Sequence, residues 1–429
     1  MMNLSTPSVD NASPDLSPAI YSPKDFLDYC IRHQILSGLI VHPSIAGRDA
    51  EQGTLALIAT QVRQNAGYAD HEAICFHVDA ECECLYFVFI HNTVRGMAQG
   101  GTRMLKYGSM NDLFFDGLRL SKAMTEKNAV AEIWWGGGKS IICPLDILPE
   151  KGSEQRKRVF ERFGGFVASL NGVYVAAEDM NTTPEDMLTI LSQNRFVTCL
   201  PRNVGGSSNP SPWTALGVFR AMKAALQYKE GKKSLEGTTV LVQGLGNVGL
   251  ILAKLCAENG ASILGADQNP QALKLLLAEI PGARSIPNEQ VYKTPCDIFA
   301  PCARGGVLDD AEVATMPCRY VIGAANNPLV NDAVHAEALH QRNILYLPDF
   351  FVNRMGIINC ANEQYGYLEE DLQLASEKIY TDVLALLKEA DSNQQTPSKI
   401  ALARANNLSA QPHPIWGHRG KRIILMFLK

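Results

Sequence analysis

The sequence lacks any apolar run that approaches the roughly 18 residues needed to cross a bilayer. Its first 23 residues contain no Lys or Arg and no apolar centre, which excludes the patterns of secretory and organelle-targeting segments. Their content of Ser, Pro and Asn predicts a flexible tail over residues 1–23. We therefore expect a cytoplasmic protein with no membrane partner.

Metal-binding spacing is also missing. The eleven cysteines are scattered, and Cys82 and Cys84 have no second pair at zinc-site spacing. We interpret them as reduced, mostly buried thiols, and we expect no metal site. A formal net charge of −5 gives no electrostatic reason to expect nucleic acid as a partner. The remaining composition is that of a globular protein, and 429 residues are enough for two domains.

A phosphate-binding loop of the form GxxxxGK[ST] is absent as well. Residues 134–140, WWGGGKS, end like such a loop, but Ile133 stands where its first glycine would be. Phosphoryl transfer is therefore disfavoured. The three glycines before Lys139 instead indicate a place where a ligand comes close to the backbone.

What the sequence does contain is a dinucleotide fingerprint in residues 238–249, TTVLVQGLGNVG. We expect a strand over 238–243, then a tight turn at Gly244, an approach of a pyrophosphate at Gly246 and close helix packing at Gly249. Asn247 and Val248 complete the turn, and the following helix offers free N–H groups to the phosphates.

A second strand, residues 261–267, ends at Asp267, which is placed to accept hydrogen bonds from the adenosine ribose. The same carboxylate would repel a 2′-phosphate, and no Lys or Arg follows before Lys274. NAD is therefore favoured over NADP. The alternative is a glycine turn in a parallel sheet that binds no ligand.

Two lysines suggest proton handling beside such a cofactor. Lys127 lies at the end of a helix predicted to begin at Ser109, and Lys139 follows the three glycines. Two ammonium groups in one cleft repel each other, and burial also penalises their charge, so both effects lower a lysine pKa. One lysine could then act as a base while the other holds a substrate carboxylate.

Several motifs occur in the same order as in a known family. They are GGTRMLKYGS, MTEKNA, GGGKS, VAAEDMNTTPEDM, NPSPWTALGV, QGLGNVG, CDIFAPCARGG, GAANNPL and PDFFVN. Residues 75–385 thus resemble the leucine/phenylalanine/valine/glutamate dehydrogenases, and the branched-chain and aromatic enzymes more than the glutamate enzymes. The resemblance implies reversible, NAD-dependent oxidative deamination of a small L-amino acid to a 2-oxo acid and ammonium, by a homo-oligomer.

The resemblance also implies roles for matched positions. Lys127 would bind the substrate α-carboxylate, Lys139 would activate water for attack on the imine, and Asp179 would shuttle protons to and from the nitrogen. The remaining positions would shape the substrate pocket (Gly100, Gly101, Met124) or lie near the cofactor and the substrate (Ala300, Asn326, Asn353).

Three positions bear on the choice of amino acid. Glutamate enzymes of the family carry a lysine immediately before the two glycines of GGxR, where this chain has Gln99. At a second specificity position, serine in glutamate enzymes and valine in leucine enzymes, this chain has Cys360, with Ile357 nearby. An unpaired carboxylate there would be costly, so we expect a neutral substrate. Because Gln99 is polar, a polar or aromatic substrate side chain stays open as well as a branched-chain one.

Some positions depart from the family pattern. Arg354 and Met355 stand where the family has alanine and glycine, and Glu132, Trp134 and Trp135 are unusual beside the catalytic loop. Either the pocket is reshaped for another substrate, or catalysis has decayed. The competing hypothesis is therefore a regulatory or assembly protein that binds NAD or an amino acid.

The expected fold is α/β with two domains. Residues 24–207 would form an α/β substrate domain, residues 208–352 a Rossmann domain, and residues 353–429 a helical segment that returns to the first domain, with the active site in the cleft between the domains. After Asp391 the chain has basic but no acidic residues. We interpret that stretch as a solvated face; docking on an acidic surface is the alternative.

Overall fold

The computed structural model describes residues 20–47 and 54–428. Most of the expected tail, residues 1–19, lies outside the described residues. Residues 20–23 of the expected tail belong to the folded domain, because Ile20 is buried and Ser22 caps the first helix, α1 (Pro23–Arg32). Among the described residues, no helix is long and apolar enough to cross a membrane.

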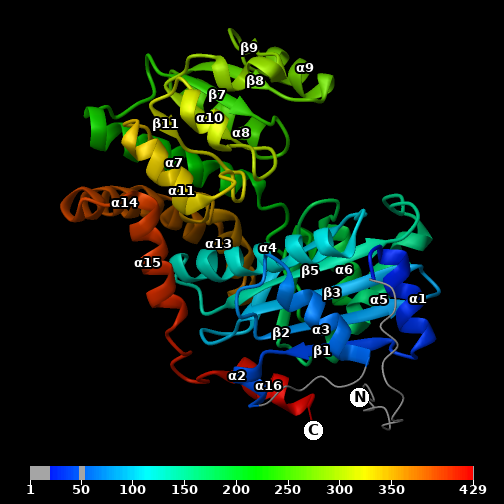
Figure 1. Ribbon diagram of the computed structural model, residues 1–429. Helices are drawn as coiled ribbons and strands as arrows, with labels where there is room; N and C mark the ends of the chain where they lie inside the picture. The colour runs from blue at the N-terminus through cyan, green and yellow to red at the C-terminus, as the bar shows by residue number, and fades with distance from the viewer. Residues whose placement is uncertain (1–19, 48–53, 429) are drawn as a thin grey trace. The chain divides into compact units, whose positions relative to one another are not determined.

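The chain divides into two compact units (Figure 1). The first contains the described residues up to Asn209 together with those from Asn407 onward, and the second runs from Pro210 to Asn406. The division falls within the Gly-, Ser- and Pro-rich stretch 201–213, whose residues favour turns over regular elements.

The first unit is built on a six-stranded mixed sheet of order β1-β2-β3-β5-β4-β6. Its strands are β1 (Ser37–Val41), β2 (Ala73–Asp79), β3 (Cys84–Asn92), β4 (Ala98–Met104), β5 (Gly136–Pro144) and β6 (Tyr174–Glu178). The strands β1, β2, β3 and β5 pair antiparallel, whereas β4 pairs parallel with both β5 and β6. The centre of the sheet therefore brings the GGTR and GGGKS motifs onto neighbouring strands.

Helices pack on this sheet around an aromatic core. They are α2 (Pro43–Ala46), α3 (Thr54–Gln64), α4 (Met110–Val130), α5 (Glu154–Ser169), α6 (Pro184–Leu191), the 3₁₀ turn η1 (Arg202–Val204) and α16 (Arg419–Met426). Phe26, Phe76 and Phe87 meet at ring distances of 5.2 to 5.8 Å, beneath α1. The predicted helix start at Ser109 is confirmed, because its hydroxyl accepts the Asp112 N–H at 3.1 Å.

The second unit contains a six-stranded, all-parallel sheet of order β12-β11-β10-β7-β8-β9. Its strands are β7 (Thr239–Gln243), β8 (Ser262–Ala266), β9 (Arg284–Ser285), β10 (Ile298–Pro301), β11 (Tyr320–Val321) and β12 (Leu345–Tyr346). The chain order runs outward from β7 on one side and from β10 on the other. This is the strand order of a dinucleotide-binding Rossmann fold, with its switch point between β7 and β10.

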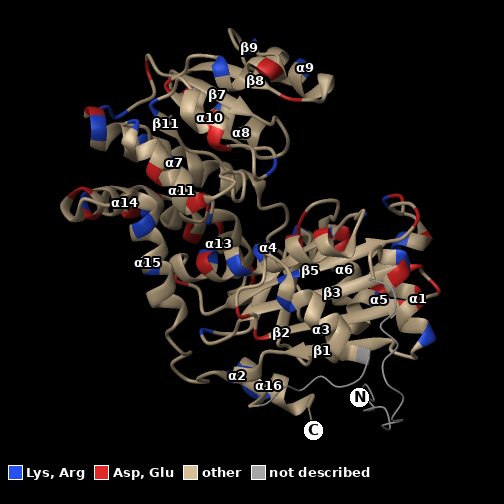
Figure 2. Ribbon diagram, viewed as in Figure 1, with Lys and Arg blue, Asp and Glu red and all other residues tan. Residues whose placement is uncertain are grey.

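The second unit also contains helices, some between the strands of this sheet and some after its last strand. They are α7 (Ser211–Glu230), α8 (Gly249–Glu258), α9 (Pro270–Glu279), η2 (Asn288–Lys293), α10 (Asp310–Thr315), α11 (Asp332–Gln341), α12 (Asp349–Val352), α13 (Met355–Asn362), η3 (Glu363–Tyr365), α14 (Glu369–Asn393) and α15 (Pro397–Ser409). Acidic residues outnumber the two lysines, Lys378 and Lys388, along α14 (Figure 2).

The C-terminal segment returns to the first unit, as expected, but later than residue 353. Residues 353–406 stay in the second unit, because α13 and α14 pack on α7. Only the chain from Asn407 onward belongs to the first unit, where α16 lies beside α2 (Figure 1). Two basic residues of α15 form ion pairs within the second unit, Lys399 with Glu337 of α11 and Arg404 with Glu389 of α14.

Candidate active site

Lys139 lies in the middle of β5, a strand that is buried along its whole length. Its side chain is only 4% exposed, and Nζ lies 2.9 Å from Oδ2 of Asp179. Asp179 follows the last residue of β6, so the parallel packing of β5, β4 and β6 brings the two predicted catalytic residues together. A buried lysine bonded to a carboxylate is the arrangement expected of a proton-transfer pair.

Arg103 completes this cluster from β4, the strand between them. Its Nε donates to the same Asp179 oxygen at 2.9 Å, and its Nη1 contacts both oxygens of Asp116 at 2.8 and 3.1 Å. Tyr107 donates its hydroxyl to Asp116 at 2.7 Å. Asp179 therefore accepts hydrogen bonds from two cationic side chains at one oxygen, while Asp116 fixes the orientation of Arg103.

The charged groups of this cluster shift one another's pKa values. Burial lowers the pKa of Lys139, Asp179 opposes that shift, and Arg103 lowers the pKa further. Burial alone would raise the pKa of Asp179, but Lys139 and Arg103 outweigh it and hold that pKa well below its ordinary value. Arg103 is thus a cation that lowers the Lys139 pKa, and the predicted effect of Lys127 on Lys139 stays a prediction.

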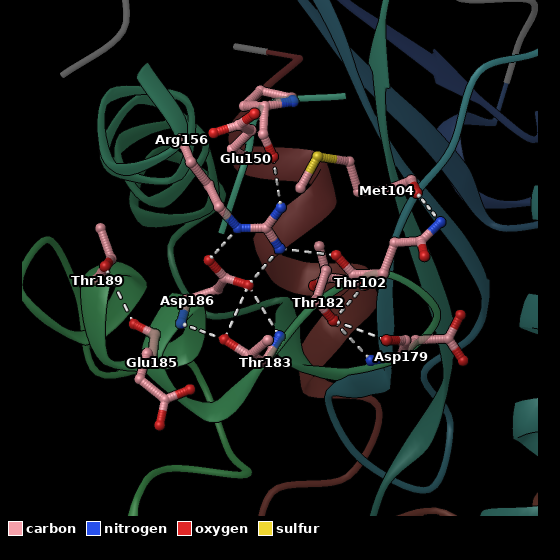
Figure 3. Close-up of polar contacts among 12 residues, drawn as sticks. Thr102, Met104, Glu150, Arg156, Asp179, Thr182, Thr183, Glu185, Asp186 and Thr189 are labelled. Atoms are coloured by element: carbon pink, nitrogen blue, oxygen red, sulfur yellow. Dashed lines mark hydrogen bonds and ion pairs between the residues drawn. The ribbon is translucent and has the colours of Figure 1, made fainter. Parts of the chain in front are cut away.

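The loop that carries Asp179 is fixed on both sides. The Asp179 N–H donates to the Thr182 hydroxyl at 2.8 Å, and this hydroxyl donates to the Thr102 carbonyl on β4 at 3.1 Å. Beyond it, Arg156 binds both oxygens of Asp186 at 2.7 and 2.8 Å in a buried, bidentate ion pair (Figure 3). The Asp179 carboxylate points away from that ion pair (Figure 3), toward Lys139 and Arg103.

The three glycines before Lys139 make room for other parts of the protein, which corrects the sequence interpretation, and Gly100 and Gly101 on β4 are packed as closely. A Cβ on Gly137 would lie 2.0 Å from Thr125 Oγ1 of α4, and one on Gly100 would lie 1.8 Å from the Gly138 carbonyl. A Cβ on Gly101 would lie 2.6 Å from the Asp179 Cβ. These glycines let β4, β5, α4 and Asp179 approach one another more closely than any side chain would allow.

The other expected substrate residues of the first unit lie on β4 and α4. Gln99 is in register with Gly137 and is fully buried, yet neither atom of its amide has a hydrogen-bond partner among the described residues. Buried polar groups are nearly always satisfied, so this amide is a group that a ligand would complete. Met124 and Lys127 are half-buried in the last two turns of α4.

In the second unit, the glycine fingerprint follows β7 at the switch point of the sheet. Gly244 has a φ of +93°, and a Cβ on Gly249 would lie 1.8 Å from the Gly244 carbonyl. A Cβ on Gly246 would meet nothing within 4 Å, and Gly246 and Asn247 are exposed at the start of α8. Val248 precedes the helix without a side-chain cap, so no side chain occupies this helix N-terminus, where anions are favoured; the Leu250 N–H already donates to the Gly246 carbonyl at 3.1 Å.

Asp267 also fits the expected dinucleotide site. It directly follows β8 and is half-buried. Its Oδ2 accepts the Leu245 N–H at 2.6 Å and its Oδ1 accepts the Asn269 N–H at 2.7 Å, so the carboxylate ties the glycine turn to β8. Each oxygen keeps a lone pair for a ribose hydroxyl. The residues present at this site therefore fit an NAD molecule.

The remaining predicted residues of the second unit lie on β10 and after β11 and β12. Asn353 donates to Asn326 Oδ1 and to the Ala324 carbonyl, both at 3.1 Å, while its own Oδ1 is buried without a partner among the described residues. Ala300 is buried on β10, beside Val242 of β7. Ile357 and Cys360 are buried on α13, where the Cys360 thiol bonds to the Gly356 carbonyl at 3.2 Å.

Comparison with known proteins decides the family. The dimerisation domain of the Glu/Leu/Phe/Val dehydrogenases matches residues 82–195, and the glutamate/leucine/phenylalanine/valine dehydrogenase domain matches residues 205–273 and 270–388. The chain belongs to the Glu/Leu/Phe/Val dehydrogenase family.

Three similar members of the Glu/Leu/Phe/Val dehydrogenases are named for three different amino acids. The leucine dehydrogenase of Geobacillus stearothermophilus is 38% identical over 314 residues, which is 73% of this chain and 84% of that protein. The phenylalanine dehydrogenase of Lysinibacillus sphaericus is 38% identical over 75% of this chain and 84% of its own length. The L-tryptophan dehydrogenase of Nostoc punctiforme is 36% identical over 79% and 94%.

The crystal structure of the same Nostoc punctiforme enzyme shares the fold of this chain. It superposes with a TM-score of 0.64 and 34% sequence identity, over 79% of this chain and 96% of that one. As a Glu/Leu/Phe/Val dehydrogenase, the chain is an oxidoreductase of the NAD-dependent amino acid dehydrogenase class.

Two of the departures from the family pattern have structural roles. Arg354 is 2% exposed, pairs with Asp382 of α14, and lies 4.4 Å over the Phe351 ring. Met355 is fully buried against Gly217 of α7. Both long side chains thus pack between α12 and α13 and the neighbouring helices α7 and α14. This packing accounts for both side chains without the narrowed cleft that the sequence suggested.

The departures before β5 lie in the turn that joins α4 to β5. Glu132 is exposed and left-handed, with a φ of +61°, and Trp135 is buried. Trp134 is 38% exposed and covers the Arg95 guanidinium, which lies 4.1 Å from its ring centroid.

Sequence reasoning missed Arg103, although it quoted the motif that contains it. Arg103 lies two residues after Gly101 on β4, so strand periodicity places both on one face of the sheet. That signal could have identified Arg103. Asp116 and Thr182 could not be found in this way, because only tertiary packing brings them to the cluster.

Proposed function

We propose that this protein catalyses the reversible oxidative deamination of a neutral L-amino acid to its 2-oxo acid and ammonium, with NAD. The observation that carries the proposal is the buried Lys139–Asp179 pair, whose nitrogen and oxygen lie 2.9 Å apart with Arg103 on the same carboxylate. Removing an amino group through an imine requires several proton transfers near neutral pH, and this pair supplies both an acid and a base.

Lys127 is proposed to bind the substrate α-carboxylate. It lies in the last turn of α4 and keeps part of its side chain accessible, in contrast to Lys139. A cation at that place would orient the amino group toward the proton-transfer pair. The other proposed substrate-binding residues are Gln99, Gly100, Gly101 and Met124 of the first unit and Asn353, Ile357 and Cys360 of the second.

When bound, NAD supplies a hydride acceptor for the substrate α-carbon. Its proposed ligands are residues of the second unit: Gly244, Gly246, Asn247, Val248, Gly249, Asp267, Ala300 and Asn326. Of these, Gly246 and Asn247 are exposed at the N-terminus of α8, where anions are favoured.

Proton movement is assigned to the buried pair. Asp179 accepts a proton from the substrate ammonium before the C–H bond breaks, and returns it to the nitrogen as ammonia leaves. Lys139, in its neutral form, takes a proton from the water whose oxygen attacks the imine carbon. The second proton of that water leaves the carbinolamine hydroxyl as the C–N bond breaks and the C=O bond forms. In total, water contributes the keto oxygen and two protons, of which one converts ammonia to ammonium and one is released to solvent, and two electrons leave as hydride.

The two groups can exchange roles because each sets the pKa of the other. A protonated Lys139 keeps Asp179 ionised, and once Lys139 is neutral the largest influence lowering the Asp179 pKa disappears. Arg103 stays charged throughout, so it holds the carboxylate in place while the proton moves.

Gln99 supports a neutral substrate side chain. Its amide is buried and offers one donor and one acceptor, but no positive charge. A glutamate side chain would leave a buried carboxylate without a cation, which is strongly unfavourable. We therefore expect leucine, valine, phenylalanine and tryptophan to be better substrates than glutamate.

The test is a substrate panel with the purified full chain. NADH formation should be steady with at least one of those four amino acids and NAD⁺, and kcat/KM for it should exceed that for L-glutamate. Lys139→Ala should abolish turnover while NAD⁺ still raises Tm. If the wild-type chain turns over no amino acid but gains Tm with NAD⁺, it is instead a regulatory or assembly protein. Faster oxidation of glutamate than of the four neutral amino acids would refute the substrate class.

The proposal extends to the assembly and location of the enzyme. We propose a homo-oligomer in the cytoplasm, as expected from the family resemblance and from the sequence. Light scattering of the purified chain tests the first part, since a monomer at micromolar concentration would contradict it.

A further inference from the structure

The chain after Asn407 makes a dense set of contacts with one edge of the first unit. His418 Nε2 lies 3.1 Å from Glu72 Oε1 and 3.1 Å from the Thr93 hydroxyl. Glu72 is 6% exposed, and it accepts the Thr93 N–H at 2.9 Å. A Cβ on Gly420 would lie 2.2 Å from Thr93 Oγ1, so the start of α16 packs against Thr93 with no space left for a side chain.

A second group of contacts joins the same segment to the turn before β5. The His413 N–H donates to the Val94 carbonyl at 3.3 Å, and the His413 ring lies 5.4 Å from that of Trp134. Trp134 in turn covers the guanidinium of Arg95 at 4.1 Å. The unusual tryptophan at position 134 therefore has a partner in the C-terminal segment.

Arg95 links the C-terminal segment to that turn directly. It is only 3% exposed. Its Nε donates to the Ile133 carbonyl at 2.7 Å, and its Nη1 donates to the Leu408 carbonyl at 3.2 Å. One planar, permanently charged side chain thus bridges two chain segments more than 270 residues apart in sequence.

These contacts lie at the N-terminal ends of the two strands that carry the candidate site. Residues 93–97 lead into β4, which bears Gln99 and Arg103, and residues 131–135 lead into β5, which bears Lys139. The two segments that precede β4 and β5 also pack tightly on each other. A Cβ on Gly96 would lie 2.1 Å from the Trp134 carbonyl, and the Gly136 N–H donates to the Met97 carbonyl at 2.8 Å.

We propose that residues 407–428 form a C-terminal clamp that sets the positions of β4 and β5, with Arg95 as its central positioning residue. The clamp acts through the backbone of the turn 131–135 and touches neither substrate nor cofactor. Its effect on catalysis rests on the proposed roles of Lys139 and Asp179. Since the Lys139–Asp179 contact spans two strands, a small displacement of β5 would lengthen it and slow proton transfer.

The test compares full-length variants by kinetics and by hydrogen–deuterium exchange. Arg95→Met removes both donors but keeps an apolar stem beneath Trp134. It should lower kcat about 10- to 100-fold, leave the Kd for NAD⁺ unchanged, and speed exchange in the peptide 131–140. His413→Ala should change the same quantities in the same direction by a smaller factor.

Two further variants make the result specific. Arg95→Lys keeps the charge and one donor, and should fall between the wild type and Arg95→Met in both kcat and exchange. Ile415→Ala is the matched control, because this side chain is 74% exposed on the same segment. It should behave like the wild type in both measurements.

Each outcome decides the proposal. A folded Arg95→Met protein with wild-type kcat and wild-type exchange in residues 131–140 overturns it. If Arg95→Met does not fold, His413→Ala decides by the same two measurements. If the wild type turns over no amino acid, the proposed function fails, while the exchange data still show whether the clamp holds β5.

Discussion

Glu178 is a buried acid that the proposed chemistry does not use. Its Oε2 has no partner among the described residues, and burial, followed by Glu185 and Asp179, raises its pKa to about 7. A carboxyl whose pKa is raised on folding stabilises the fold below its unfolded pKa, near 4.5, and loses that contribution as pH rises through 7. Above pH 7 the protein therefore carries an ionised, poorly solvated group.

Replacing Glu178 by Gln should relieve this cost. At pH 8 we expect Glu178→Gln to raise Tm by about 3 °C, and the gain should shrink to nothing as pH approaches 4.5. Calorimetric scans of both proteins over this pH range measure it. A Tm difference that is the same at both ends of the range would contradict the assignment.

Asp179 and Lys139 give a second prediction at this scale. The rate should rise with pH as Lys139 loses its proton, with a midpoint below the ordinary lysine pKa of 10.5, because burial lowers that pKa. Asp179→Asn removes the carboxylate that favours the protonated lysine, so the midpoint should move lower still, while kcat falls. Profiles of kcat/KM against pH measure both effects.

The neighbouring acid provides a control for that shift. Glu178→Gln removes a carboxyl adjacent in sequence that makes no bond to Lys139. It should leave the lysine midpoint closer to that of the wild type than Asp179→Asn does. Equal midpoints in the wild type and Asp179→Asn would show that Lys139 is not the titrating base.

Individual side chains were predictable from the sequence only in part. The family motifs pointed to Lys139 and Asp179, and the structure brings these two residues together. The role of Arg103, which also lowers the Lys139 pKa, was not predicted, because only Lys127 was considered as a neighbouring cation. Sequence spacing gives no measure of which residues on neighbouring strands face each other.

At the scale of elements, the glycine turn after β7 offers a matched pair of substitutions. A Cβ at Gly249 would meet the Gly244 carbonyl at 1.8 Å, whereas a Cβ at Gly246 would meet nothing within 4 Å. Gly249→Ala should destabilise the protein by on the order of 3 kcal/mol, because the helix α8 must move away from the turn. Urea unfolding measures this loss.

Gly246→Ala should have the opposite profile. The fold has room for the methyl group, so stability should stay at the wild-type value, but a pyrophosphate would meet it, and affinity for NAD⁺ should fall about tenfold. Titration calorimetry gives the affinity. Normal NAD⁺ binding by Gly246→Ala would place the dinucleotide away from this turn.

Elements with local signals were predicted well, and elements that depend on distant partners were not. The helix start at Ser109 and the β7–α8 turn follow from capping and glycine rules that act within a few residues. The glycines at 136–138 were misinterpreted, because a glycine run looks the same whether a ligand or another strand approaches it. Here the approaching atoms belong to Asn92, Thr125 and Tyr174.

At the scale of the whole molecule, each unit has its own sheet and its own buried core. The expected division near residue 207 lies close to the observed one after Asn209, because the turn-forming composition of that stretch is a local property. The return of the chain at Asn407 was expected at residue 353 and comes later. Its position depends on how α13 and α14 bury their apolar faces on α7, which sequence periodicity does not specify.

Separate cores predict that the two units respond differently to the cofactor. The proposed NAD ligands all belong to the second unit, so saturating NAD⁺, at about 100 times its Kd, should stabilise that unit by about 2.7 kcal/mol. Slow-exchanging amides of β7, β8 and β10 should gain protection, and those of β2 and β3 should not. The comparison is native-state hydrogen exchange with and without NAD⁺. Equal gains in both sheets would mean that the units unfold as one cooperative body.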